Sequence, residues 1–181
     1  VASTVNEVLL LKYLLKNSDD KKLKKYLLSY YTDMIKSTLF RQTQFAEFEY
    51  AAHTMAEEGK PLTKDALNEV YYNLNKKYYG RSVVSDDEIA YEWARIPHFY
   101  NAFYVYKYAT GITSAITIAE RIYAEGEEAV KDYFKFLSSG GSDSPVELLK
   151  LAGVDLTKKE PFKKAMESFK LALDEYEAIE L

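Results

Sequence analysis

Residues 19–58 form the longest regular pattern in the chain and read DDKKLKKYLLSYYTDMIKSTLFRQTQFAEFEYAAHTMAEE. The stretch contains neither Pro nor Gly. Its apolar residues recur every three or four positions, as at Leu23, Tyr26, Leu27 and Tyr30. This spacing places apolar side chains on one face of an α-helix. We therefore expect one long helix, straight or kinked, that ends at Gly59-Lys60-Pro61, because Gly and Pro interrupt helices.

The following segments also favour helices. Thr63 is a typical N-cap residue, and we expect a helix from there through Tyr79 that ends at Gly80. Residues 85–88 read Ser-Asp-Asp-Glu, the pattern of a capping box in which the serine accepts a hydrogen bond from an unpaired amide. This pattern predicts a short helix that begins at Ser85 and extends through Trp93.

The second half of the chain continues the helical pattern. Pro97 suits the first turn of a helix, and the apolar spacing after it predicts helix as far as Tyr123. Ser144-Pro145 is a strong helix start, and a last helix is expected over residues 161–177. No strand-like alternation or internal repeat is present in the sequence. We therefore predict an all-α fold of about seven helices, and a single helical domain over residues 1–181.

Composition limits the possible functions. Hydrophobic residues make up 48% and charged residues 29%, values typical of a folded globular protein. The net charge is -4 and basic residues are not clustered, so we expect no nucleic-acid partner. The apolar run Val8–Leu11 is far too short to span a bilayer, and we expect no membrane association. The absence of cysteine excludes disulfides and thiol nucleophiles, and it favours a cytoplasmic location.

Residues 96–111 contain the candidate functional residues and read IPHFYNAFYVYKYATG. On a continuous helix, Tyr100, Tyr104 and Tyr108 would share one face, with His98 near its start. A histidine and phenols on one surface can donate hydrogen bonds to an oxygen that gains negative charge during a reaction. A buried helix with a packed aromatic stripe explains the same spacing, so the pattern alone leaves both interpretations open.

The sequence contains no complete metal or nucleophile site that can be recognised from its motifs. It has two histidines, His53 and His98, and no His-Glu-x-x-His motif. We expect His53 to lie on a helix surface or in the core. A Gly-x-Ser-x-Gly motif is also missing, and residues 140–142 are expected to form a flexible turn.

Several stretches resemble the C-terminal part of oligoendopeptidase F, a bacterial zinc peptidase related to thimet oligopeptidase. They occur in the same order as in that family: residues 1–7 (VASTVNE), residues 40–49 (FRQTQFAEFE), residues 96–111, and more weakly residues 137–145 (LSSGGSDSP). The third stretch is the most specific.

The resemblance implies a zinc metalloendopeptidase that hydrolyses internal bonds of short peptides. It also implies that the His-Glu-x-x-His motif and a ligand glutamate precede Val1, so no metal ligand is expected in this chain. The chain does not begin with Met, and we interpret it as the C-terminal fragment of a zincin-type catalytic domain. Its expected partners are an oligopeptide substrate and the N-terminal remainder of the enzyme. Alone it should be inactive, and its exposed apolar surface could self-associate.

Residue roles also follow from the resemblance. His98 and Tyr106 are the expected catalytic residues, which would donate hydrogen bonds to the oxyanion. Tyr100 and Tyr104 are the expected substrate-binding residues. The alternatives are a helical interaction domain, whose aromatic stripe is core or a groove for a partner helix, and a helical domain with a tyrosine-lined ligand pocket.

Overall fold

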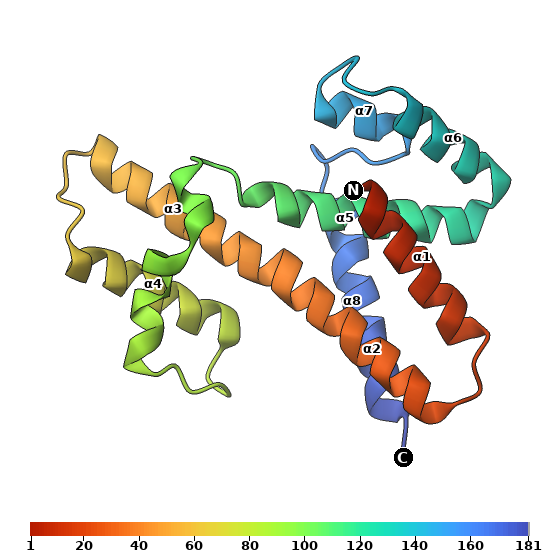
Figure 1. Ribbon diagram of the computed structural model, residues 1–181, viewed down its shortest axis with the longest axis horizontal. Coiled ribbons are helices and arrows are strands. Elements are labelled where there is room, and N and C mark those ends of the chain that lie inside the picture. Colours follow the sequence, from red (N-terminus) through yellow and green to blue (C-terminus); the bar gives the residue numbers. More distant parts are fainter. Residues whose placement is uncertain (181) are drawn as a thin grey trace. The chain divides into compact units, whose positions relative to one another are not determined.

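The computed structural model describes residues 1–180, and every regular element in that range is helical (Figure 1). The all-α prediction is therefore confirmed, with eight α-helices within residues 1–180 where about seven helices were expected. Across residues 1–180, no helix combines the length and the apolar character that are needed to cross a membrane. The α-helices are α1 (Ala2–Lys16), α2 (Lys21–Ile35), α3 (Arg41–Glu57), α4 (Lys64–Tyr79), α5 (Tyr106–Glu125), α6 (Glu127–Ser138), α7 (Pro145–Leu151) and α8 (Glu160–Ala178).

The long helix predicted from residues 19–58 is present. Asp20 caps α2 by accepting hydrogen bonds from the backbone amides of Lys22 and Leu23. The π-helical turn η1 (Lys36–Phe40) follows α2 directly, and α3 follows η1 without a loop. A π turn accommodates an extra residue within a helix, so the helical backbone continues through this irregularity.

The helix boundaries follow the local chemistry, with one correction. The Thr63 hydroxyl caps α4 through the amide of Ala66 at 3.2 Å, and the Ser144 hydroxyl caps α7 through the amide of Glu147 at 3.3 Å. The prediction for residues 85–88 was wrong in its cap. Asp86 accepts from the amide of Ile89, and the helix that follows is the 3-10 helix η2 (Asp87–Arg95).

The predicted continuous helix from Pro97 to Tyr123 was wrong at its start. Only the short 3-10 helix η3 (Pro97–Tyr100) forms there, and α5 begins at Tyr106. Between them, Phe103 has a positive φ of 55°, which no α-helix accommodates. Its backbone amide donates to the Glu49 carboxylate at 2.6 Å instead of to a helical carbonyl.

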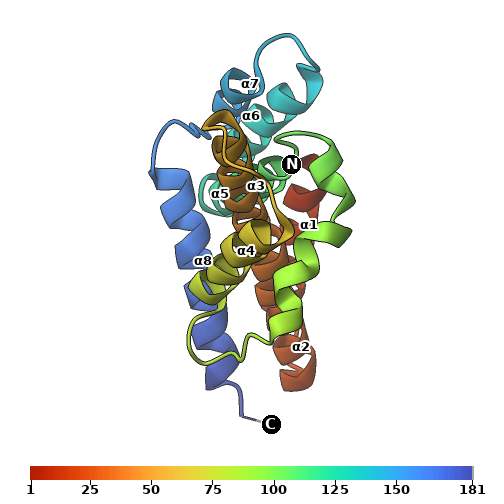
Figure 2. The same cartoon turned by 90° about the vertical axis from the view of Figure 1, so that its left-hand side faces the viewer.

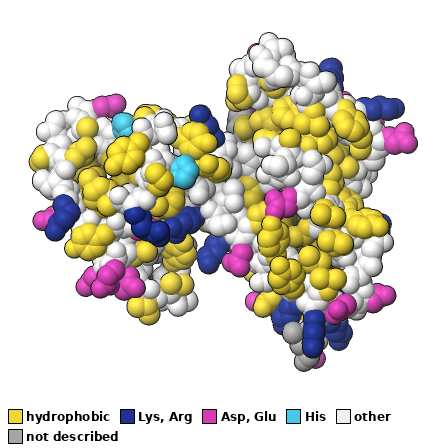
Figure 3. Space-filling view, in the orientation of Figure 1, with side chains coloured by type: hydrophobic (Ala, Val, Ile, Leu, Met, Phe, Trp, Pro, Cys, Tyr) yellow, Lys and Arg dark blue, Asp and Glu magenta, His cyan; other side chains and the backbone are white. Residues whose placement is uncertain are grey.

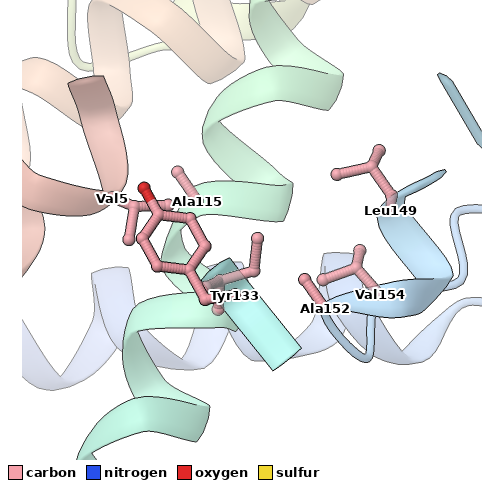
Figure 4. Packing of buried hydrophobic residues seen from close by; sticks show 7 residues of the cluster. Val5, Ala115, Tyr133, Leu149, Ala152 and Val154 are labelled. Carbon is pink, nitrogen blue, oxygen red and sulfur yellow. The ribbon is translucent and has the colours of Figure 1, made fainter. Parts of the chain in front are cut away.

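The helices form two compact units, residues 37–109 and residues 1–36 with 110–181. In the second of these, α2 packs along α8 and α6 packs against α7 (Figure 1). Its core joins α1, α5, α6 and the α7 region through the residues drawn in Figure 4, which include Val5, Ala115, Tyr133 and Val154. The Tyr133 hydroxyl donates to the carbonyl of Ala2 at 3.2 Å, so its ring is buried while its polar atom is satisfied. The prediction of one domain over residues 1–181 stays a prediction.

The unit of residues 37–109 is built on α3. Helix α4 packs beside α3 in both views of the ribbon, and η2 packs against α4 (Figures 1 and 2). Its core contains Phe45, Phe48, Tyr71 and Val105, with the partly buried Trp93 and Phe99 packed against it. The Phe48 ring lies 5.3 Å from that of Tyr71 and 5.9 Å from that of Trp93, measured between centroids.

A buried carboxylate joins three elements of this unit. The Glu92 side chain accepts hydrogen bonds from Arg41 at 2.5 Å, from the Tyr71 hydroxyl at 2.5 Å and from Arg95 at 2.7 Å. We call these four residues the Glu92 cluster. Burial alone would raise the pKa of Glu92, but the hydrogen bonds from Tyr71 and Arg41 outweigh it and lower the pKa. The cluster therefore ties η2 to α3 and α4 through charged hydrogen bonds.

Replacing Glu92 with Ala should destabilise this unit by about 2 kcal/mol, since a buried hydroxyl and a guanidinium lose their charged acceptor. Urea unfolding followed by the fluorescence of Trp93, the only tryptophan in the chain, measures the loss. Glu88→Ala is the matched control, because Glu88 is an exposed residue of the same 3-10 helix. Equal effects of the two substitutions would contradict the structural role of Glu92.

The Glu92 cluster also predicts a dependence of stability on pH. The pKa of Glu92 is lower in the folded chain than the value of about 4.3 expected when unfolded. Its stabilisation is therefore complete above the unfolded value and disappears as the pH falls through the folded-state pKa. Urea midpoints measured from neutral to acidic pH should fall less in Glu92→Gln than in the unsubstituted chain. Parallel profiles would argue against a depressed pKa.

Candidate functional site

Three aromatic side chains meet on the surface of the unit of residues 37–109. The His98 ring on η3 stacks with Tyr104 at 5.8 Å between centroids and with planes 17° apart. Tyr108, in the first turn of α5, meets His98 edge-on at 6.0 Å and Tyr104 at 5.6 Å. We call His98, Tyr104 and Tyr108 the aromatic triad. All three side chains are exposed, so the triad can contact a ligand.

The structure brings some of the predicted site residues together and separates others. His98 and Tyr104 are in contact, whereas Tyr100 is 91% exposed at the end of η3. Tyr106 is the first residue of α5 and is 48% exposed. Two positions along a helix correspond to a rotation of about 200°, which directs Tyr106 and Tyr108 to different sides of α5.

Sequence reasoning did not assign Tyr108 to the site. The four-residue spacing from Tyr104 was the available signal, because side chains at that spacing meet on a helix. A hydrogen bond with Tyr104 raises the pKa of Tyr108. Like other phenols, Tyr108 is protonated at neutral pH and can donate a hydrogen bond. The Lys107 ammonium lies 5.0 Å from the centroid of the Tyr104 ring, where a cation is attracted to the ring face.

Buried anchors lie directly next to two members of the triad, His98 and Tyr104. Phe99 follows His98 directly, and its ring packs 5.8 Å from Phe45 and 5.4 Å from Phe48. Val105 follows Tyr104 directly and is 1% exposed. The apolar anchors fix the backbone beside two exposed polar rings, so the hydrophobic core also determines where His98 and Tyr104 lie.

A cavity of about 260 Å³ lies beside this segment. Its walls are mostly apolar, and its ionisable groups are the Glu49 carboxylate, the His53 imidazole and the Tyr100 phenol. Figure 3 shows histidine side chains among hydrophobic ones on a face of this unit. The lining residues are Phe48, Glu49, Ala52, His53, Leu62, Leu67, Trp93, Ala94, Ile96, Phe99 and Tyr100.

His53 is on the helix surface, one of the two places expected for it, and its ring contacts Phe103 at 4.6 Å between centroids. No group of three or more His, Cys, Asp or Glu side chains that could hold a metal ion is present in residues 1–180. The triad itself offers hydrogen bonds from one imidazole and two phenols. Such donors can bind a peptide backbone or stabilise an oxyanion.

The profile of Peptidase family M3 matches residues 1–168. The chain belongs to this family. It is 50% identical over 179 residues to oligopeptidase PepF of Bacillus subtilis, covering 99% of this chain and 27% of that protein. It is 48% identical over 180 residues to an oligoendopeptidase F homolog of Borreliella burgdorferi, covering 99% of this chain and 30% of that one. The chain thus spans less than a third of these relatives.

Solved structures agree with the family M3 assignment. Oligoendopeptidase-F from Enterococcus faecium matches with a TM-score of 0.95 and 47% identity, over 98% of this chain and 34% of that one. A putative peptidase from Chlamydophila abortus matches with a TM-score of 0.92 and 45% identity, over 99% of this chain and 30% of that one. The resemblance to oligoendopeptidase F noted in the sequence is therefore confirmed, and the chain is a fragment relative to these family members.

The contact between the phenols of the triad can be tested directly. Tyr104→Phe removes the hydroxyl that raises the pKa of Tyr108, so this pKa should fall toward the ordinary value of about 10. Tyrosine labelled with carbon-13 at the ring carbon that bears the hydroxyl allows the titration to be followed by NMR. Tyr100→Phe, at a highly exposed position, is the control and should leave Tyr108 unchanged. An unchanged titration in both variants would contradict the described pairing.

Proposed function

We propose that this chain is part of a zinc metallo-oligopeptidase that hydrolyses internal bonds of short peptides, and that residues 98–108 bind the substrate. The aromatic triad carries the proposal, because it places three polar aromatic groups on an exposed surface of a family M3 chain. The names of its relatives, an oligopeptidase and an oligoendopeptidase F homolog, support short peptides as substrates.

Each candidate residue has a proposed role as a hydrogen-bond donor. His98 and Tyr106 would stabilise the oxyanion that forms on the scissile carbonyl, and Tyr100 and Tyr104 would bind the peptide backbone. Tyr108 joins them because of its contacts with His98 and Tyr104. Donors that are fixed before the substrate binds stabilise the transition state more than mobile donors do, because no reorganisation is needed.

The metal would be bound outside this chain. The resemblance implies zinc, but the part of the chain that the structure describes offers no group of side chains that fits a metal ion. The resemblance also implies that the zinc ligands belong to a portion of a longer polypeptide preceding Val1, and we propose that zinc binds there. The roles proposed for this chain are limited to hydrogen bonds and packing, and the chain alone would be inactive.

The surface supports a covering partner. Leu10, Tyr13 and Leu14 on α1 are exposed by 58%, 59% and 36%. Adjacent exposed apolar groups on one helix are typical of an interaction surface. We propose that the remainder of the polypeptide covers them, and that the isolated chain self-associates through such surfaces. A cytoplasmic location rests on the composition alone and is part of the same proposal.

Kinetics of the complete polypeptide test the proposed roles. His98→Ala, Tyr104→Phe, Tyr106→Phe and Tyr108→Phe each remove one donor, and each donor assigned to the oxyanion should cost about a hundredfold in kcat. Donors that bind only the peptide backbone should instead mainly raise KM. A short quenched fluorescent peptide reports both constants.

The control is Tyr50→Phe, which removes a phenol from a 68% exposed position in the same unit. It should leave turnover unchanged. Unaltered turnover in all four variants, the three of the triad and Tyr106→Phe, would exclude this surface from the active site. Metal content and thermal unfolding of each variant separate a lost donor from a lost fold.

A further inference from the structure

The backbone at Phe103 has a conformation that its side chain disfavours. Phe103 is the only residue other than glycine with a positive φ in residues 1–180. An L-residue in the left-handed region brings its Cβ close to the carbonyl oxygen that follows, so this conformation persists only when surrounding contacts hold it. Phe103 lies immediately before Tyr104, so the turn determines how Tyr104 approaches His98.

Two side chains one turn apart on α3 contact Phe103. The Glu49 carboxylate accepts the Phe103 amide at 2.6 Å, and the Glu49 side chain is 4% exposed. The His53 ring lies 4.6 Å from the Phe103 ring, with planes 36° apart. We call Glu49 and His53 the α3 clamp. It holds both the backbone and the side chain of Phe103.

The α3 clamp acts between two points that are already fixed. Phe99 and Val105 are packed in the core at either end of the loop, and each holds the chain through its side chain rather than through the Phe103 backbone. A buried carboxylate that accepts a backbone amide provides that restraint, since charged hydrogen bonds are stronger than neutral ones. The restraint orients the following residue, Tyr104, against the His98 ring.

We infer that Glu49 and His53 are positioning residues of the active site, with Glu49 the dominant one. They would hold the loop so that His98, Tyr104 and Tyr108 face a peptide substrate together. Neither residue belongs to the triad, and their effect on turnover would be transmitted through Phe103. This inference rests on the proposed function, because it assigns the α3 clamp to the surface that would bind the peptide.

The test compares Glu49→Ala with Glu49→Gln in the complete polypeptide. Ala removes the acceptor, whereas Gln keeps an oxygen that can accept the Phe103 amide. Hydrogen exchange measured by mass spectrometry over residues 101–105 should accelerate in Glu49→Ala and recover largely in Glu49→Gln. Small errors in the position of catalytic groups cost up to about a hundredfold in rate, so kcat should fall by at least about tenfold in Glu49→Ala and by clearly less in Glu49→Gln.

Glu57→Ala, an exposed position on the same helix, is the control and should change neither readout. Hydrogen exchange over the rest of residues 37–109, measured in the same experiment, verifies that the unit stays folded. Phe103→Gly provides a second variant, because glycine adopts a positive φ without strain but loses the ring that His53 contacts. In this variant, hydrogen exchange over residues 101–105 should stay slow, and turnover should be higher than in Glu49→Ala.

Unchanged exchange of residues 101–105 in Glu49→Ala would overturn the clamp itself. Faster exchange with full turnover, while His98→Ala is impaired, would overturn the positioning role and leave the proposed function intact. Full turnover in both Glu49→Ala and His98→Ala would overturn the proposed function, and the inference with it. Equal loss of kcat in Glu49→Ala and Glu49→Gln would also contradict the inference, because the acceptor oxygen would not be the feature that matters.

Discussion

The hydrogen bond from the Phe103 amide to Glu49 is the interaction on which the candidate site depends. Without it, the apolar spacing of residues 97–123 would favour one continuous helix, with the tyrosines in a stripe along it. With it, the chain turns between η3 and α5, and Tyr104 stacks on His98. A single buried acceptor thus binds the backbone amide at the point where the expected helix is interrupted, next to the cluster of three donors. Burial of the Glu49 carboxylate strengthens this hydrogen bond, because water would compete with the Phe103 amide for an exposed carboxylate.

Other contacts within the unit of residues 37–109 support the start of this segment, at η3. The Glu92 cluster fixes η2, which leads directly into η3, and the rings of Phe45 and Phe48 receive Phe99. Each contact originates on α3 or α4, two helices that pack against each other. Rigid helices can therefore place exposed polar rings precisely, as an active site requires.

Much of the fold could be predicted from local chemistry. The long helix of residues 19–58, the Thr63 cap and the Ser144-Pro145 start depend on residues near each other in the chain, and the structure has all three. The break at Phe103 could not be predicted, because Glu49, whose carboxylate accepts the Phe103 amide, is 54 positions away. The position of Tyr108 beside His98 depends on the same break. Asp86 rather than the expected Ser85 caps η2, and the Ser85 hydroxyl instead accepts a hydrogen bond from the Asn75 side chain, a partner ten positions away.

The central claim is that the surface formed by residues 98–108 binds a peptide substrate. The most direct measurement is a crystal structure of the complete polypeptide with an uncleaved peptide bound. We expect the peptide backbone within hydrogen-bond distance of His98 and at least one triad phenol, with Phe103 still donating to Glu49. A peptide that is bound productively with no contact to residues 98–108 would contradict the claim.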